Sequence, residues 1–504
     1  MDMLVQVLAG FQSALTPEAL FYCFIGVTIG TLVGVLPGIG PLAAISLALP
    51  VTFYLDPTLA LIMLAGIFYG AQYGGSTAAI LLNIAGDASS AVTCLDGYPL
   101  SRQGRAGVAL FVTTIASFIG GSVAILALIG LAPVLARLAL QFGPAEYFSI
   151  MLLGLIAAST LSVGSPVKGL AMVLVGSVLG LVGMDVNSGQ LRFTYGFMQL
   201  IDGVDLAVIA MGLFGLSEIL TNVGRDRSKE KPISRVSLRS MIPTREDIRI
   251  ATMPAMRGSL LGTAMGTLPG IGPTIASFMA YALEKRVSRT PERFGKGALE
   301  GVASPEAANN ASVQAAFIPT LSLGIPGNAV MAVMLGAMMI HGVVPGPGFL
   351  NDQPEMFWGL VASFWIGNLM LLILNIPLIG IWVRILAIPY QLLYIIIVFF
   401  ICVGVFSLRG SSFDIFLVLI FGVAGYLLTL FRYPLAPLLL GFILGPMIEQ
   451  YFKRAMLIAR GDITVFAMRP LSAVFLALAL GLLVVTVVTF LRNRQSTILV
   501  AEEN

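Results

Sequence analysis

Residues 30–41, Gly-Thr-Leu-Val-Gly-Val-Leu-Pro-Gly-Ile-Gly-Pro, recur as residues 262–273, Gly-Thr-Ala-Met-Gly-Thr-Leu-Pro-Gly-Ile-Gly-Pro. Nine of the twelve positions agree at an offset of 232 residues. Each copy places a Pro-Gly-Ile-Gly-Pro break inside a long apolar segment. Paired breaks at matching places in two halves of a chain point to the binding site of a membrane transporter. Backbone groups freed by such a break persist at membrane depth only where they are buried in protein or line a cavity.

The composition indicates a helical protein that crosses a membrane many times. Hydrophobic residues make up 58% of the 504 residues and charged residues 11%, whereas a soluble domain carries about 25% charged residues. Apolar runs of about 20 residues, the length that spans a bilayer, recur along the chain. We therefore expect an all-α polytopic membrane protein with about 10–12 transmembrane helices. The three cysteines (Cys23, Cys94 and Cys402) show no disulfide or metal-ligand spacing.

Charged residues place one long polar segment on the cytoplasmic side. Residues 222–257 hold nine Lys or Arg residues against four acids, and cytoplasmic loops carry the excess of Lys and Arg. We interpret 222–257 as a basic cytoplasmic linker between a first half, 1–221, and a second half, 258–469. Residues 470–504 form a terminal transmembrane helix and a cytoplasmic tail.

Equivalent loops of the two halves carry opposite charge patterns. After the first Pro-Gly break, residues 50–58 hold an acid and no cation, whereas residues 284–297 after the second break hold five basic residues. The next pair of loops reverses this pattern: Arg102 and Arg105 mark the first-half loop, and residues 341–357 hold only acids. Equivalent loops therefore lie on opposite sides of the membrane, and the two halves are inverted repeats.

The second motif fits a re-entrant helical hairpin. Residues 258–283 lie between basic Arg257 and basic Lys285, and 26 residues are too few for two crossings of about 20 residues each. The motif at 37–41 would form the counterpart that enters from the other face. The alternative interpretation is close helix packing, with Gly30 and Gly34, and likewise Gly262 and Gly266, as GxxxG contacts.

A second pair of polar segments follows the hairpins. Residues 70–88 and 301–329 are rich in Gly, Ser, Thr and Asn, and Ile84-Ala85-Gly86-Asp87-Ala88 aligns with Ile325-Pro326-Gly327-Asn328-Ala329 at an offset of 241. Each segment is longer than one crossing needs. A second discontinuous helix or re-entrant segment is therefore expected in each half.

These segments supply the candidate site residues. Neither Pro-Gly motif and neither polar segment holds Lys or Arg, so an anionic substrate would be held by backbone N–H groups at broken helix ends and by hydroxyl and amide groups. The candidate substrate-binding residues are Pro37, Gly38, Gly40, Gly74, Gly75, Ser76, Thr77, Asn83, Gly270, Gly272, Asn309, Asn310, Ser312, Thr320, Gly327 and Asn328. Asp87 and Glu306 are the candidates for coupling a cation or proton. The alternatives are that the amides and hydroxyls only join helices and that the two acids cap helices.

Several of these motifs resemble a known family. The paired Leu-Pro-Gly-Ile-Gly-Pro motifs, Tyr73-Gly74-Gly75-Ser76-Thr77 and Pro305-Glu306-Ala307-Ala308-Asn309-Asn310 are similar to the large membrane subunit of the tripartite tricarboxylate transporters, over roughly residues 18–470. One departure is Ala85 in place of the family's proline, whereas the second half keeps Pro326.

This resemblance implies a cation-coupled carboxylate importer in the bacterial inner membrane. It implies two partners, a small membrane subunit and a periplasmic solute-binding protein that delivers citrate or a related acid. No enzymatic activity, cofactor or resident metal is expected. The coupling ion is Na⁺ or H⁺, and the many neutral oxygen ligands favour Na⁺. An elevator mechanism, in which the hairpin domain slides against a scaffold, fits this architecture by analogy.

Two other functional classes were weighed against this prediction. An enzyme would need a nucleophile–base set or metal ligands, and a single histidine without clustered carboxylates argues against one. An ion channel would carry polar residues along its whole path, whereas here they concentrate in two zones. A channel or a transporter of another small anionic solute remains the alternative.

One region conflicts with this topology. Helix counting places residues 451–469 outside, yet they hold four basic residues and one acid. Either residues 433–450 fail to cross, or the positive-inside rule is locally broken.

Overall fold

The computed structural model describes residues 3–36, 40–160, 165–185, 188–223, 236–268, 270–386 and 390–502. Within them the chain is almost wholly helical, and the strands are β1 (Gly183–Met184) and β2 (Leu191–Arg192), paired antiparallel. Seven described helices are long and apolar enough to span a membrane, and six shorter apolar helices accompany them. The predicted all-α polytopic class is confirmed.

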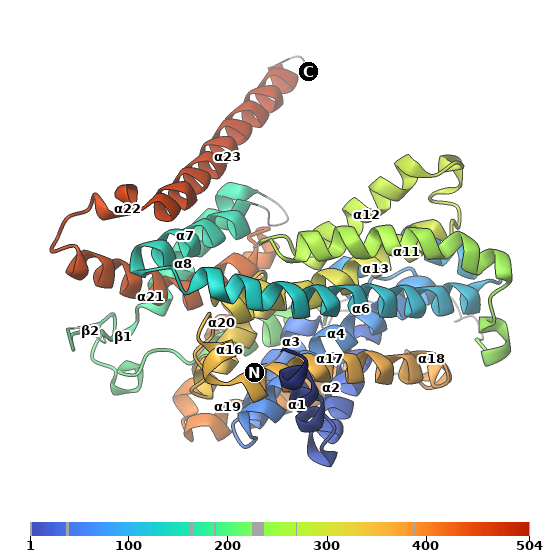
Figure 1. Ribbon diagram of the computed structural model, residues 1–504, viewed down its shortest axis with the longest axis horizontal. Helices are drawn as coiled ribbons and strands as arrows, with labels where there is room; N and C mark the ends of the chain where they lie inside the picture. The colour runs from blue at the N-terminus through green and yellow to red at the C-terminus, as the bar shows by residue number, and fades with distance from the viewer. Residues whose placement is uncertain are drawn as a thin grey trace.

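The first half begins with helices that surround the first Pro-Gly break. They are α1 (Met3–Ala14), α2 (Pro17–Val35), α3 (Pro41–Thr52), α4 (Pro57–Leu82), η1 (Ala88–Ala91), α5 (Cys94–Arg102) and α6 (Ala106–Ala139). In Figure 1, α6 runs across the middle of the molecule beside helices of the second half, and α23 (Pro470–Glu502) projects away from the body.

The second half repeats this order after the short helix η4 (Leu238–Met241). Its helices are α11 (Arg245–Gly266), α12 (Pro273–Val287), η5 (Pro291–Arg293), α13 (Glu300–Ala315), α14 (Phe317–Leu323), α15 (Ala329–Ile340), α16 (Phe349–Asp352), α17 (Pro354–Asn375) and α18 (Ile379–Ile385). The offset of 232 residues aligns the start of α3 with that of α12, and the offset of 241 aligns α4 with α13 and α14. We call the helices α2–α6 and α11–α17 the core.

Most of the remaining helices form two arms beside the core, whereas α1 and α18 pack on α17 and α2 of the core itself. Arm A consists of α7 (Pro144–Thr160), α8 (Pro166–Gly180) and α21 (Leu435–Ile458), with α22 (Val465–Met468) and α23 packed on α7. Arm B consists of α19 (Tyr390–Arg409), α20 (Ser412–Leu430) and the continuous run α9 (Leu206–Ala210), π-helix η3 (Met211–Leu216) and α10 (Ser217–Asn222). The short helix η2 (Met198–Leu200) precedes α9. Each arm therefore combines helices of both halves.

Each Pro-Gly motif lies at a helix break. Helix α2 ends at Val35 and α3 begins at Pro41, while α11 ends at Gly266 and α12 begins at Pro273. The Arg257 side chain donates to Glu284 from Nε (3.0 Å) and Nη2 (2.5 Å), which joins α11 to α12. The second motif is thus a helical hairpin, as expected.

The boundary expected for the basic linker needs correction. Helix α11 begins at Arg245, inside the range 222–257, because the Thr244 side chain accepts from the Asp247 N–H and Asp247 accepts from the Thr244 N–H. This capping box starts the helix thirteen residues before the expected position. Residues 224–235 of the linker lie outside the described residues.

Glycines bring the helices of each repeat into backbone contact. Gly34 of α2 lies against the Ala71 carbonyl oxygen of α4, and Gly266 of α11 lies against that of Ser312 in α13. The glycines one and two turns earlier lie against other backbone carbonyl oxygens of α4 and α13 in the same way. They are Gly26 and Gly30 in α2, and Gly258 and Gly262 in α11. The GxxxG pairs therefore do serve close helix packing. The helix breaks at the Pro-Gly motifs are present as well, so the two interpretations do not exclude each other.

Contacts at the helix ends show the inversion directly. An offset of 246 residues makes α8 and α20 equivalent, with Gly176 matching Gly422. Lys168, at the start of α8, donates to the Phe431 carbonyl oxygen just after α20 (2.7 Å). Arg409, just before α20, contacts Asp205 (3.7 Å), which follows the loop after α8. The two equivalent helices therefore run in opposite directions.

The course of α21 shows where residues 451–469 lie relative to the rest of the chain. Helix α21 is continuous and runs parallel to α8, since Gly176 meets the backbone at Leu438 and Gly180 meets it at Phe442. Residues 433–450 thus follow the same path as α8, and 451–469 lie at the same end as β1 and β2. Two of the cations in this segment are paired: Lys453 with Asp185 (2.9 Å) and Arg469 with Glu146 (3.0 Å).

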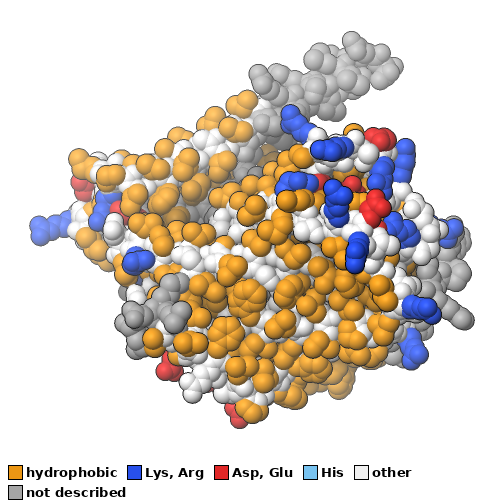
Figure 2. All heavy atoms as spheres, turned by 45° about the vertical axis from the view of Figure 1, so that its right-hand side comes forward, with side chains coloured by type: hydrophobic (Ala, Val, Ile, Leu, Met, Phe, Trp, Pro, Cys, Tyr) orange, Lys and Arg blue, Asp and Glu red, His pale blue; other side chains and the backbone are white. Residues whose placement is uncertain are grey.

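The surface separates apolar from basic regions. Figure 2 shows a mostly apolar face with Lys and Arg side chains gathered along its upper right margin. The exposed basic side chains of α12 and the loop after it are Lys285, Arg286, Arg289, Arg293 and Lys296. This distribution fits an apolar belt that ends at a basic face.

Replacement of Gly262 by Leu tests the glycine contacts. The added side chain would overlap the backbone of α13 at Ala308, and such overpacking costs about 3 kcal/mol or more. We expect the G262L protein in detergent to unfold at a clearly lower temperature than the wild type. The control is G130L in α6, where an added Cβ meets nothing within 4 Å; equal losses in both variants would contradict the contact.

Replacement of Asp96 by Asn is a second test of stability. The buried Asp96 carboxylate joins α5 to the loop before α13 by hydrogen bonds. Oδ1 accepts from the N–H groups of Gly295 (2.9 Å), Gly297 (2.7 Å) and Ala298 (2.8 Å), and Oδ2 accepts from Tyr281 Oη (2.9 Å). The D96N amide keeps an acceptor oxygen for the three N–H groups but removes the negative charge that these donors stabilise, at a cost of about 1.5–3 kcal/mol. The unfolding temperature of D96N should be lower than that of the wild type, whereas D202N, at an exposed acid, should unfold at the wild-type temperature. An unchanged unfolding temperature for D96N would show that Asp96 does not stabilise the fold in this way.

Candidate functional site

Both polar segments contain a helix break at equivalent positions. Helix α4 ends at Asn83, whose φ is +61°, and α14 ends at Gly324, whose φ is +70°. The two residues are related by the offset of 241. A left-handed residue ends a helix and redirects the chain. The predicted second discontinuous helix is present in each half.

The candidates Asp87 and Asn328 are equivalent helix caps. Asp87 accepts from the Ala88 N–H at the start of η1 (2.7 Å), and Asn328 accepts from the Met331 N–H at the start of α15 (3.0 Å). The capping alternative for Asp87 is therefore observed. Its carboxylate remains partly exposed and Asn83 is exposed, so this part of the site opens to the surface.

The Pro-Gly tip of each hairpin lies against or beside the helix break of the polar segment in its own half. The Gly270 N–H (φ +86°) donates to the Gly327 carbonyl oxygen (2.8 Å), which joins the second tip to the second break. In the first half, Gly86 packs against the Gly34 carbonyl oxygen at the end of α2. Pro37 and Gly38 lie outside the described residues.

Helices α3 and α12 both begin without a side-chain cap. Gly40 and Gly272 precede these helices, neither supplies a side-chain cap, and an added Cβ at either meets nothing within 4 Å. No described side chain therefore caps the positive end of either helix dipole or the unpaired N–H groups of its first turn. These two ends can accept negatively charged oxygen atoms.

Glu306 and Asn309 lie fully buried on α13 beside the first break. Glu306 Oε1 accepts from Thr93 Oγ1, which is 213 residues away in sequence, and Glu306 Oε2 has no hydrogen-bond partner. The Asn309 side chain interacts with the Glu306 carboxylate, and neither its nitrogen nor its oxygen has another hydrogen-bond partner. Both side chains are 0% exposed. Buried polar atoms are nearly always paired, so these orphaned atoms point to a ligand.

Gln72 and Ser89 extend this group toward Asp87. Ser89 Oγ lies 2.7 Å from Gln72 Oε1 and 2.6 Å from Asp87 Oδ2, and Gln72 Nε2 has no partner. A hydroxyl has one hydrogen, so the Gln72 amide can instead turn its nitrogen to Ser89. In either orientation one polar atom of Gln72 is left unpaired. We call Gln72, Asp87, Ser89, Thr93, Glu306 and Asn309 the central polar cluster.

Other predicted residues have structural roles or lie beside the cluster. Gly74 packs on α2, Gly75 lies near Ser90, Ser76 donates to the Tyr73 carbonyl oxygen, and Thr320 donates to that of Ala316. Asn310 donates to Ser117 Oγ (2.7 Å), and its oxygen is unpaired. Ser312 is buried with an unpaired hydroxyl, and Thr77 is buried in α4.

The sequence interpretation missed four members of this neighbourhood. Gln72, Ser89, Thr93 and Ser117 are single polar residues in apolar or loop sequence, and no spacing links them to Glu306 or Asn310. The signal that could have indicated Gln72 is its place in the otherwise small and apolar run before Tyr73. The folded chain alone brings them together.

The cluster can hold a cation near an anion site. It contains two acids close to one another, neutral oxygen atoms, and no Lys or Arg among its six members. Like charges at short distance favour uptake of a proton or a cation, and hard cations prefer such oxygen ligands. The helix starts at Gly40 and Gly272, which lack side-chain caps, are of the kind that can accept negatively charged groups.

Comparison with known proteins agrees with the motifs. The model of the tripartite tricarboxylate transporter TctA family matches residues 20–440. A protein of Agrobacterium vitis, "Uncharacterized 52.8 kDa protein in TAR-I ttuC' 3'region", is 48% identical over 503 residues, which cover 100% of both chains. A second Agrobacterium vitis protein, "Uncharacterized protein in TAR-II ttuC' 3'region", is 46% identical over 242 residues, 48% of this chain and 100% of that protein. No solved structure matches.

The family match spans the Pro-Gly motifs, both helix breaks and the central polar cluster. The resemblance predicted from these motifs is confirmed. The chain belongs to the tripartite tricarboxylate transporter TctA family and is a membrane subunit of a tricarboxylate transporter.

Proposed function

We propose that this chain forms the transport pathway of a Na⁺-coupled importer of di- and tricarboxylates such as citrate. A small membrane subunit and a periplasmic binding protein would complete the system in the bacterial inner membrane. The observation that carries this proposal is the central polar cluster, in which buried atoms of Gln72, Glu306 and Asn309 lack partners. The cluster adjoins a helix break, where transporter substrates and coupling ions bind.

The substrate would bind at the helix starts near the two tips. A carboxylate group can accept N–H donors from the first turn of α3 or α12, which lack side-chain caps. Neither tip carries a Lys or Arg, so backbone dipoles alone balance little of the charge of a tricarboxylate. A bound cation would offset part of the remainder.

The coupling cation would bind at Glu306. Its unpaired Oε2 and the unpaired amide oxygen of Asn309 are two ligands of the type that Na⁺ prefers. Neutral oxygen atoms outnumber carboxylates here, which favours Na⁺ over H⁺. Asp87 lies near Glu306, and its negative charge would raise the affinity for either cation.

Alternating access would take the elevator form. The core holds both hairpins and both breaks, whereas the arms hold long helices joined by glycine contacts. If the core moved as one rigid body against fixed arms, it would carry the central polar cluster across the membrane. The contacts between each hairpin and the helices it packs on would stay unchanged during this movement.

Uptake by proteoliposomes tests the substrate and the role of Asn309. The vesicles would hold this chain, its small subunit and the binding protein, with labelled citrate competed by other carboxylates under a Na⁺ or a proton gradient. We expect Na⁺-driven uptake, reduced at least tenfold in N309A because a ligand is lost. The control is N375A, a buried asparagine of α17 that bonds its own helix. No carboxylate uptake under either gradient, with all components folded, would overturn the proposal in favour of a channel or another anion.

Glu306→Gln tests the coupling ion separately. The amide keeps the size of the side chain and removes its charge, so the Na⁺ concentration for half-maximal uptake should rise at least tenfold. The control is E300Q, on the same helix and also with a buried unpaired oxygen. An unchanged Na⁺ concentration for half-maximal uptake in E306Q would show that Glu306 does not bind the coupling Na⁺, and wild-type uptake driven by a proton gradient without Na⁺ would identify the proton as the coupling ion.

A further inference from the structure

The connection between α8 and α9 is much longer than its equivalent in the second half. Leu206 and Gly212 of the α9–η3 run match Leu435 and Gly441 of α21 at an offset of 229 residues, so α21 is the equivalent of that run, as α20 is of α8. The chain passes from α20 to α21 in residues 431–434, whereas it passes from α8 to α9 in residues 181–205. The short connection already joins one arm to the other, so the fold does not require the longer one. We call residues 181–205, which include β1, β2 and η2, the insertion.

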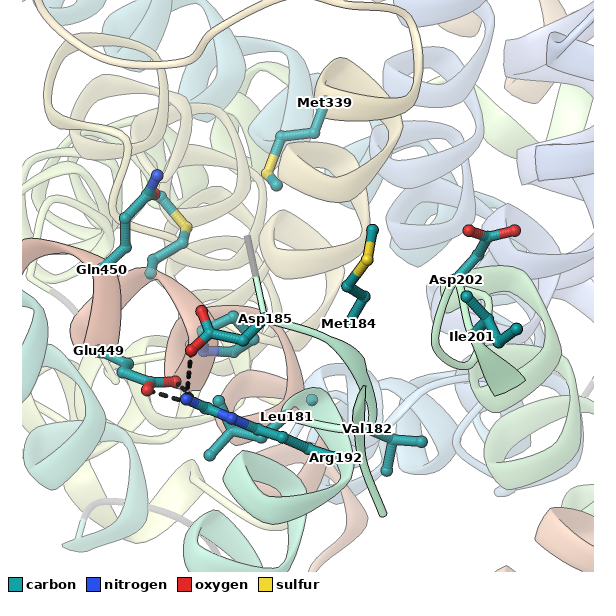
Figure 3. Close-up of a pocket in the computed structure, with 13 residues that line it drawn as sticks. Leu181, Val182, Met184, Asp185, Arg192, Ile201, Asp202, Met339, Glu449 and Gln450 are labelled. Carbon is teal, nitrogen blue, oxygen red and sulfur yellow. Dashed lines mark hydrogen bonds and ion pairs between the residues drawn. The ribbon is translucent and has the colours of Figure 1, made fainter. Parts of the chain in front are cut away.

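The insertion is fixed to both arms. Arg192 of β2 donates to Glu449 of α21 (2.8 Å) and to Asp185 of the insertion, and Figure 3 shows these three side chains meeting at one wall of a cavity. The ring of Phe197 stacks on that of Phe413 in α20, with 6.0 Å between the ring centroids. The described part of the insertion is therefore an ordered extension of arms A and B.

The outer side of the insertion presents large apolar side chains. Tyr195 is 83% exposed and Met198 is 79% exposed, and Phe193 is also exposed. Phe193 and Tyr195 have positive φ angles of +54° and +49°, which bulky residues rarely adopt. Such strain persists only where the surrounding structure imposes it, and it is commonest at functional sites. These side chains are of the kind that a protein partner covers, because Tyr, Phe and Met are enriched at interfaces between proteins.

The end of arm A continues this surface. Lys453 of α21 pairs with Asp185 of the insertion (2.9 Å), so residues 451–469 lie beside the insertion. Arg454 and Arg460 are exposed, and neither pairs with an acid of the described residues. The exposed large apolar side chains of this segment are Leu457, Ile458, Ile463 and Met468. The insertion and residues 451–469 together form an apolar surface that carries two unpaired positive charges, and we call it the end surface.

Helix α6 separates the end surface from the basic loop after α12. Gln103, just before α6, donates to the carbonyl oxygen of Lys296 in that loop (2.8 Å). Gly143, just after α6, donates to Glu146 (2.8 Å), which pairs with Arg469 of arm A (3.0 Å). Helix α6 has 34 residues and is therefore about 50 Å long, more than the apolar thickness of a bilayer. The end surface and the basic loop thus lie at opposite ends of the molecule (Figure 1).

We propose that the end surface docks the periplasmic solute-binding protein, through an apolar patch on that protein with acidic residues at its border. The identity of the partner rests on the proposed function. Basic loops lie in the cytoplasm, which puts the end surface on the periplasmic side, where a soluble binding protein approaches. Acids on that protein would complement Arg454 and Arg460, the cations that arm A leaves unpaired. The connection is extended at this end alone, as a partner present on one side of the membrane requires.

A protein docked there would lie beside the junction of arm A and the core. A cavity of about 400 Å³ lies between the insertion, the end of α21 and Met339 at the end of α15 (Figure 3). The insertion and α21 belong to the arm side of this cavity, and Met339 belongs to the core. The docked protein would therefore be held on the arm while its substrate is released next to the core.

Uptake and binding measurements with surface variants test this proposal. This chain and its small subunit would be reconstituted in proteoliposomes, with citrate-loaded binding protein added outside. In Y195A with M198A, and in R454E with R460E, the concentration of binding protein at half-maximal uptake should rise at least tenfold, while the maximal rate stays unchanged. The dissociation constant measured directly in nanodiscs should rise by the same factor. Its increase with salt, expected of the wild type, should be lost in R454E with R460E, because the screened ion pairs are absent.

The matched controls are I242A and R289E, which alter an exposed apolar and an exposed basic side chain at the opposite end and should leave binding and uptake at the wild-type level. Wild-type affinity in both double variants, in protein that unfolds at the wild-type temperature, would overturn the proposal and leave the end surface to lipid or to a second copy of the chain. Binding by the wild type that both double variants lose, without uptake of any carboxylate, would leave the docking surface standing and remove the proposed function.

Discussion

The structure depends on one constraint: a backbone N–H or C=O group freed inside apolar surroundings must find a partner within the protein. The chain breaks its helices at Asn83 and Gly324, and again at the hairpin tips. The bond from the Gly270 N–H to the Gly327 carbonyl oxygen shows how one break satisfies another. Because the free backbone groups of one helix break form hydrogen bonds with those of another, the breaks must lie close together. The unpaired backbone groups of each half are therefore gathered in the core.

Glycine packing makes this arrangement possible. The contacts of Gly34 on Ala71 and of Gly266 on Ser312 bring hairpin and broken helix to backbone distance. At that separation the α13 side chains on the neighbouring faces, Glu306 and Asn309, are excluded from water. Their unpaired buried atoms cost free energy as long as no further group pairs with them.

The arms give the fold a second level of symmetry. Each half contributes its last helix to the arm built by the other half, since α21 packs on α7 and α8 while α9, η3 and α10 pack on α20. Such exchange ties the halves together and leaves two similar arms around one core. The core packs differently on each arm, so the two inverted halves have unequal surroundings.

The sequence by itself determined the class, the repeat, the inversion and the positions of the breaks, because apolar length, Pro-Gly motifs and loop charges are local patterns. It also indicated Glu306 and Asn309 from their polarity within apolar sequence. Only the tertiary structure decided that Gly30 and Gly262 serve packing, that Thr93 meets Glu306 from 213 residues away, and that residues 451–469 lie beside β1 and β2. Those facts depend on which helices pack together and in which direction, and contacts between distant segments leave no periodic signal in one chain.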